Sequence, residues 1–156
     1  MLIAATQGHQ GVFDVLVGLH VVSALVGFGS VAISGVYGAA ARRSDESGLS
    51  EETARYFRSR GWTELLILGV PVFGAAAIGF RPEGADFGGL WVIGGFVAWA
   101  LAAALLLGVV RPAESRIRSG GEPADRSGSG GRLMWAAAGC DVLFVIALAL
   151  MITQPA

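Results

Sequence analysis

Residues 15–41 read VLVGLHVVSALVGFGSVAISGVYGAAA, a run with no acidic residue, lysine or arginine. The hydrocarbon core of a bilayer is about 30 Å thick, and about 20 helical residues are needed to cross it. The run is longer than that and is the first of four apolar stretches in the chain. It therefore predicts a membrane-spanning helix.

The four apolar stretches predict helices over residues 13–41, 62–80, 89–110 and 133–153. Hydrophobic residues make up 54% of the 156 residues, and charged residues only 15%. Soluble domains have about 25% charged residues. We therefore expect an all-α fold, with a single membrane domain over residues 1–156. Short connections favour an up-down antiparallel bundle of four transmembrane helices.

The arginines predict how this bundle is oriented. Loops 42–61 and 111–132 carry five arginines each, whereas the middle loop has only Arg81 and the termini have none. Basic residues concentrate in the cytoplasmic loops of membrane proteins. We therefore expect both arginine-rich loops in the cytoplasm and both termini outside, in the inner (plasma) membrane. The chain has no basic arm that would bind nucleic acid.

The two cytoplasmic loops differ in composition. Ser50 is a suitable helix N-cap and precedes two glutamates, which predicts a short cytoplasmic helix from about Glu51. Residues 119–131 read SGGEPADRSGSGG, which is typical of a mobile linker. We therefore expect a helix within loop 42–61 and no regular structure over residues 119–131 of the other loop.

Small and polar residues form one stripe along the first predicted helix. In a bilayer, such stripes mark where helices pack, because apolar burial no longer drives association. The third helix has a weaker stripe that contains Gly94 and Ala98. We expect these stripes to pack against neighbouring helices and the first to extend to a second copy or a membrane-complex partner. The first stripe comprises His20, Ser23, Gly27, Ser30, Ser34 and Gly38, with Val17, Leu25, Phe28 and Val36 opposite it and facing lipid.

His20 and Asp141 are the two ionisable groups expected well inside the membrane. A carboxylate at the centre of a membrane helix costs about 2.5–3.5 kcal/mol, so Asp141 should find a partner. Two interpretations remain open. Asp141, His20 and the serines Ser23, Ser30 and Ser34 either form interhelical hydrogen bonds or mark a path for a proton, an ion or a ligand.

No enzyme motif stands out, since the chain lacks a nucleophile–base pair, a nucleotide-binding glycine motif and an HExxH sequence. Haem needs His or Met ligands at facing positions, and copper needs clustered soft ligands. His20, Met134, Cys140 and Met151 form no such cluster along the sequence. We therefore expect no cofactor and no metal site, with haem or copper as the alternative; haem bound by two histidines would need His20 from two subunits.

These features favour a non-catalytic accessory or scaffold bundle, with the lipid bilayer as its first partner. The alternative is a transport or redox component, linked to a proton, a metal or haem, that uses His20 and Asp141.

Three segments carry a family resemblance. They are Leu19-His20-Val21, the Gly/Ser-rich continuation to Arg42-Arg43, and the closing segment from Leu150 to Pro155. In these segments the chain resembles a bacterial family of four-helix integral membrane proteins of unknown function. It is more distantly similar to the copper-resistance D-type membrane domain. The resemblance implies a four-helix bundle in which His20 recurs. Gly27-Phe28-Gly29 departs from the Trp-Gly-Gly that is common in the copper-related proteins, and Gln154 stands where the family usually has a basic residue. Both departures count against copper handling.

Overall fold

The computed structural model describes residues 2–44, 48–59, 62–81, 87–120 and 122–153. Within these ranges the chain is helical and contains no strand, which confirms the all-α prediction. A 3-10 turn (Thr63–Leu65) precedes α3, and a π-helical turn (Leu106–Val110) joins α4 to α5. The α-helices are α1 (Leu2–Arg43), α2 (Glu51–Ser59), α3 (Leu66–Gly79), α4 (Leu90–Leu105), α5 (Arg111–Arg118) and α6 (Pro123–Thr153).

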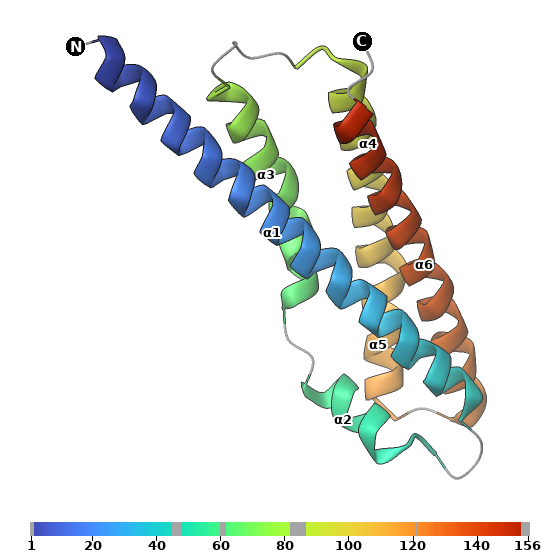
Figure 1. Cartoon of the computed structure of the whole chain (residues 1–156). Coiled ribbons are helices and arrows are strands. Elements are labelled where there is room, and N and C mark those ends of the chain that lie inside the picture. The colour runs from blue at the N-terminus through green and yellow to red at the C-terminus, as the bar shows by residue number, and fades with distance from the viewer. Residues whose placement is uncertain (1, 45–47, 60–61, 82–86, 121, 154–156) are drawn as a thin grey trace.

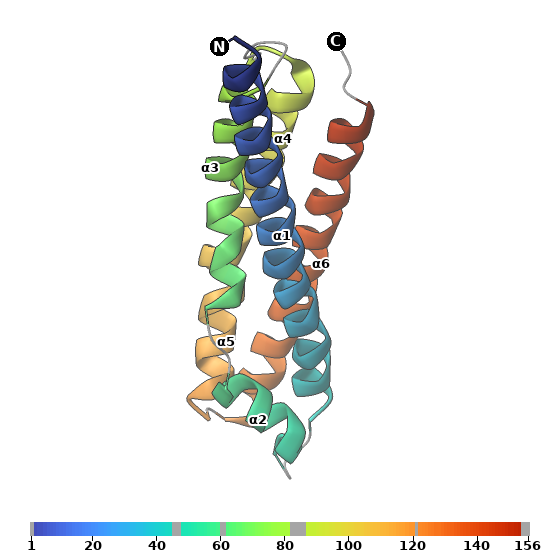
Figure 2. The same cartoon turned by 60° about the vertical axis from the view of Figure 1, so that its left-hand side comes forward.

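The long helices α1, α3, α4 and α6 lie side by side and alternate in direction (Figures 1 and 2). Three helices are long and apolar enough to cross a membrane: Gln10–Arg43, Leu90–Arg118 and Pro123–Thr153. α3 with its preceding turn reaches that length only when it is joined to α2 across a bend of 53°. The described chain therefore has three candidate spans, and four if this bent pair counts as one.

The short helices lie together at the end of the molecule where α1 ends and α6 begins (Figure 1). The short helix predicted from about Glu51 is observed, because α2 starts at Glu51 and the backbone N–H of Thr53 donates to Ser50 Oγ at 3.3 Å. The outer connection expected over residues 81–89 lies largely outside the described residues.

Two helix boundaries differ clearly from the prediction. α1 begins at Leu2 instead of residue 13, and residues 111–132, expected as a loop, are mostly helical. The linker prediction is wrong for residues 123–131, which form the first turns of α6. Tertiary packing explains this result, since a Cβ added to Gly130 would lie only 2.6 Å from the carbonyl oxygen of Gly38. Glycine thus lets α6 approach the α1 backbone closely enough to stabilise a helix that composition disfavours.

The π-helical turn has a local cause in the sequence. Pro112 has no N–H, and its ring would collide with the carbonyl of the residue four positions earlier, Gly108, in a regular α-helix. The widened turn over Leu106–Val110 ends just before this proline. The helix therefore continues through Pro112 into α5 without a break in direction large enough to separate two spans.

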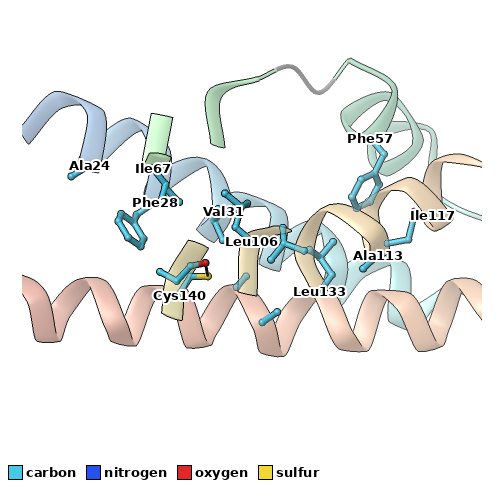
Figure 3. Packing of buried hydrophobic residues seen from close by; sticks show 14 of the residues in the cluster. Ala24, Phe28, Val31, Phe57, Ile67, Leu106, Ala113, Ile117, Leu133 and Cys140 are labelled. Carbon is cyan, nitrogen blue, oxygen red and sulfur yellow. Dashed lines mark hydrogen bonds between the residues drawn. The ribbon is translucent and has the colours of Figure 1, made fainter. Parts of the chain in front are cut away.

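The core runs along the middle of the bundle and toward the end where α2 and α5 lie, which we call the arginine-rich end (Figure 3). Phe57 of α2 points toward Ala113 and Ile117 of α5, which ties the short helices together (Figure 3). The expectation that Phe28 faces lipid is wrong. Its side chain is buried and its ring stacks on Phe144 with centroids 4.8 Å apart. The reason is that α1 packs against both α3 and α6, so it has two buried faces.

Several glycines lie at close contacts between the helices. A Cβ added to Gly27 would lie 2.8 Å from the backbone nitrogen of Ile67 on α3. One added to Gly38 would meet Leu133 of α6 at 2.9 Å, and one added to Gly94 would meet Leu150 of α6 at 2.7 Å. Ala98 is also buried. Within the described chain, the small-residue stripes thus lie at contacts inside the bundle.

Candidate functional site

His20 lies on α1 against the middle of α3. Its Nδ1 is 2.8 Å from the carbonyl oxygen of Val70. Because a carbonyl only accepts, this hydrogen bond places the hydrogen of the neutral ring on Nδ1 and leaves a lone pair on Nε2. A Cβ at Gly74 would lie 2.9 Å from Nδ1, so glycine makes room for the ring. His20 is therefore oriented by the backbone of α3, with Nε2 able to accept a hydrogen bond or bind a metal.

The backbone of α3 is unusual just beside His20. Pro71 lies inside α3 and has no N–H, so the carbonyl of Ile67 loses its usual helical donor. Trp99 of α4 supplies the missing hydrogen bond, with its Nε1 2.8 Å from that carbonyl oxygen. His20 of α1 and Trp99 of α4 thus form hydrogen bonds with two backbone carbonyls of α3, those of Val70 and Ile67 respectively.

A pocket of about 480 Å³ opens beside these two residues, and we call it the His20 pocket. It lies among α1, α3 and α4, and Met151 of α6 completes it. α1 inclines away from α4 and α6 toward its N-terminal end, in the part of the molecule where the pocket lies (Figure 1). Its aromatic lining residues are Phe13, Trp91, Phe96 and Trp99, and its polar ones are Gln10, Asp14, His20 and Arg81.

The polar residues of the pocket lie at two levels along the bundle. Gln10 and Asp14 lie six or more residues before His20 on α1, which places them at least about 9 Å nearer its N-terminal end. Arg81 follows the end of α3 at that same end of the molecule. The pocket therefore has polar residues at the N-terminal end of α1, aromatic walls, and one further polar side chain, His20, nearer the middle of the bundle.

Met151 and His20 line this one pocket, although they are far apart in the sequence. Of the four potential ligands considered from the sequence, only these two line the His20 pocket. Met134 and Cys140 are not part of the lining, and Cys140 is fully buried against the carbonyl of Ala102. Across the described residues, no group of three or more His, Cys, Asp or Glu side chains could hold a metal ion.

Asp141 lies elsewhere in the bundle. On α6 it falls between Ala137, which packs at Gly35, and Phe144, which stacks on Phe28. It is therefore level with about Val31 of α1, about 17 Å from His20 along the helix axis. The structure does not bring Asp141 into the His20 pocket. Within the described chain, no hydrogen bond or ion pair involves its half-buried carboxylate.

The serines of α1 serve its contacts with other helices. Ser23 is buried, and Ser34 is fully buried with its hydroxyl 2.9 Å from both the Ser30 carbonyl oxygen and the Tyr56 hydroxyl. Tyr56 of α2 also stacks on Tyr37, with ring centroids 4.0 Å apart. The serine stripe therefore includes the point where α2 docks on α1.

Replacing Tyr56 with phenylalanine should weaken this docking by about 1 kcal/mol, because the buried Ser34 hydroxyl loses a partner while the ring stacking remains. Hydrogen exchange of the α2 amides measures the effect. Tyr37→Phe is the matched control: it removes only an exposed hydrogen bond to Glu52 and should change exchange much less. Equal exchange in the two variants would refute this role of Ser34.

Sequence reasoning missed the burial of two carboxylates, Glu64 and Glu114. Glu64, at the start of the α3 segment, is 2% exposed and lies 4.0 Å from the Nε of Arg111. Glu114 of α5 is also 2% exposed. Glu114 falls in a stretch expected to be a loop, and its 3–4-residue spacing from Val110 and Ile117 was the available signal of a buried helix face.

Comparisons with known proteins place the chain in a family. No curated protein and no solved structure matches it, and nothing found supports the similarity to the copper-resistance D-type domain. One family model, described as "Predicted integral membrane protein (DUF2269)", matches residues 14–155. This match spans every described helix except the first turns of α1. With its apolar helices packed through small residues, the chain therefore belongs to this family of predicted integral membrane proteins.

Proposed function

We propose that this is a four-span membrane protein that binds a small, mainly apolar ligand in the His20 pocket. The observation that carries the proposal is the pocket itself, with aromatic walls and one histidine oriented by a hydrogen bond. Ligand sites are typically apolar concavities with a few placed polar groups. The volume of about 480 Å³ falls within the range of about 300–1,000 Å³ typical of such sites.

The proposed topology has both termini on the outer side of the inner membrane. In support, α2 and α5 lie at one end of the bundle (Figure 1), with the arginine-rich segments, while Arg81 lies at the other end. Basic residues favour the cytoplasmic side. The polar end of the His20 pocket then faces outward, and α3 supplies the fourth span, with α2 bent away from it at the cytoplasmic end.

The lining limits the chemistry of the ligand. Trp91, Phe96 and Trp99 suit a flat apolar body, because aromatic rings stack in offset or edge-to-face geometry. The Nε2 lone pair of His20 suits a hydroxyl donor or a metal ion. We therefore infer either a hydroxylated aromatic compound or haem, for which Met151 is a candidate second ligand. The metal- or haem-linked alternative thus rests on His20 and Met151, with Asp141 outside the site.

Protein purified in mild detergent and placed in lipid nanodiscs tests the proposal. The absorption spectrum and native mass spectrometry report any ligand that co-purifies, and titrations with hemin and with 1-naphthol probe the two ligand classes. His20→Asn is the informative variant, since its amide can still donate to Val70 while the Nε2 lone pair is lost. We expect folded yield to survive and binding to weaken about tenfold or more.

Asp141→Asn serves as the control and should bind as the unaltered protein does. Unchanged binding in His20→Asn would refute the contact with His20. If nothing co-purifies and neither probe binds, the pocket proposal fails as a whole.

A non-catalytic accessory or scaffold bundle is the second candidate. The observation that favours it is that Ser34, Gly27 and Gly38 all lie at internal helix contacts. Association with a second copy or a complex partner would then use outer apolar faces, such as Val142, Val145 and Ile152 of α6, which are exposed in one chain.

A further inference from the structure

A second hollow lies at the arginine-rich end of the bundle, far from His20. It has a volume of about 670 Å³ and lies where α1, the end of α4 and the first turns of α6 meet. We call it the arginine groove. The residues that matter for its chemistry are Arg42, Leu105, Val109, Ser127, Arg132 and Trp135.

The arginine groove changes from polar to apolar along its length. Arg42 and Ser127 lie at the level of Gly130 of α6, whereas Leu105 packs at Gly139, about 14 Å further along that helix. On α6 the lining runs from Ser127 to Ala136, about 14 Å at the helical rise. The headgroup region of one leaflet is about 5–8 Å thick, so a groove of this length reaches from the headgroups into the hydrocarbon.

Trp135 marks the boundary between these two layers. Its side chain is 70% exposed, at the level where α6 changes from Gly/Ser-rich to apolar sequence. Tryptophan is enriched at the membrane–water interface because its ring is amphipathic. This position makes the polar end of the groove level with lipid phosphates.

The charge at the polar end is positive and accessible. Arg42 and Arg132 are both exposed, and among the described residues no carboxylate lies within 4.0 Å of either guanidinium. Arg111, on the neighbouring helix, does have such a carboxylate in Glu64. Guanidinium groups bind phosphate oxygens through paired hydrogen bonds.

We propose that the arginine groove binds an anionic phospholipid, with the phosphate between Arg42 and Arg132 and an acyl chain along Leu105 and Val109. The polarity gradient matches a phospholipid better than a free anion, which would leave the apolar half uncovered. Such a lipid would also bridge α1 and α6 where Ser127 Oγ donates to the carbonyl of Arg42 at 3.1 Å.

Native mass spectrometry of the whole protein tests this proposal. Protein in mild detergent is mixed with phosphatidylglycerol or phosphatidylcholine, and the lipid-bound fraction is measured. We expect phosphatidylglycerol to be retained in preference. The double variant Arg42→Gln/Arg132→Gln should lower its retention about tenfold or more.

The matched control is Arg116→Gln/Arg118→Gln. This variant removes the same number of positive charges, two, from exposed positions of α5 outside the groove. It should retain the lipid as the unaltered protein does. Circular dichroism verifies folding, and Arg42→Lys/Arg132→Lys replaces the glutamine variant if that variant does not fold. Equal loss in the control, equal retention of both lipids, or displacement by equimolar inorganic phosphate would overturn the proposal.

Discussion

Replacing Gly130 with valine is expected to lower the stability of the bundle by about 1–3 kcal/mol, the usual cost of overpacking. A Cβ at this position would lie 2.6 Å from the Gly38 carbonyl oxygen and 2.7 Å from the Arg42 backbone nitrogen. Both are backbone atoms of α1 and cannot turn aside as a flexible side chain would. The two helices would therefore have to separate. Thermal unfolding in detergent, followed by circular dichroism, measures the loss.

Gly128→Val is the matched control for this experiment. Gly128 lies two residues earlier on α6, and a Cβ added there meets nothing within 4 Å. Both substitutions introduce the same β-branched residue into the same helix, so their difference isolates the contact with α1. Equal losses would mean that the sequence of α6, and not its close approach to α1, determines stability.

Replacing Trp99 with phenylalanine should also destabilise the bundle, by about 1–3 kcal/mol. The carbonyl of Ile67 would lose the Nε1 donor at 2.8 Å, and Pro71 offers no helical N–H to replace it. In a bilayer, water is not available to compensate. The prediction is specific to this pair, because an alanine at position 71 would restore the missing N–H.

A double-mutant cycle separates this cause from lost packing. Trp99→Phe should cost less in a Pro71→Ala background than in the natural sequence, by about 0.5–1.5 kcal/mol. Thermal unfolding of the four proteins gives the coupling. If the two changes in the free energy of unfolding are additive, the Trp99 hydrogen bond does not compensate for the N–H that Pro71 lacks. The cost of Trp99→Phe would then reflect the packing lost with the smaller ring.

The site was partly predictable. His20 and the small residues around it could be chosen from spacing alone, since a helix places positions three and four apart on one face. Spacing along the chain could not show whether His20 and Asp141 lie at the same level of the bundle, because the level of Asp141 depends on where α6 begins. Phe28 shows the same limit, since a helix with two packed faces has no single lipid side that periodicity can reveal.

By itself, the sequence determined the all-α class, the apolar helices, α2 with its Ser50 cap, and the gathering of arginines at one end. These follow from local composition and from period, which need no knowledge of neighbours. Only the tertiary structure made a helix of the Gly/Ser-rich residues 123–131, buried Glu114 and brought Met151 into the pocket of His20. The physical reason is that close contact with another helix, as at Gly130 against α1, outweighs local propensity and joins residues that are distant in the chain.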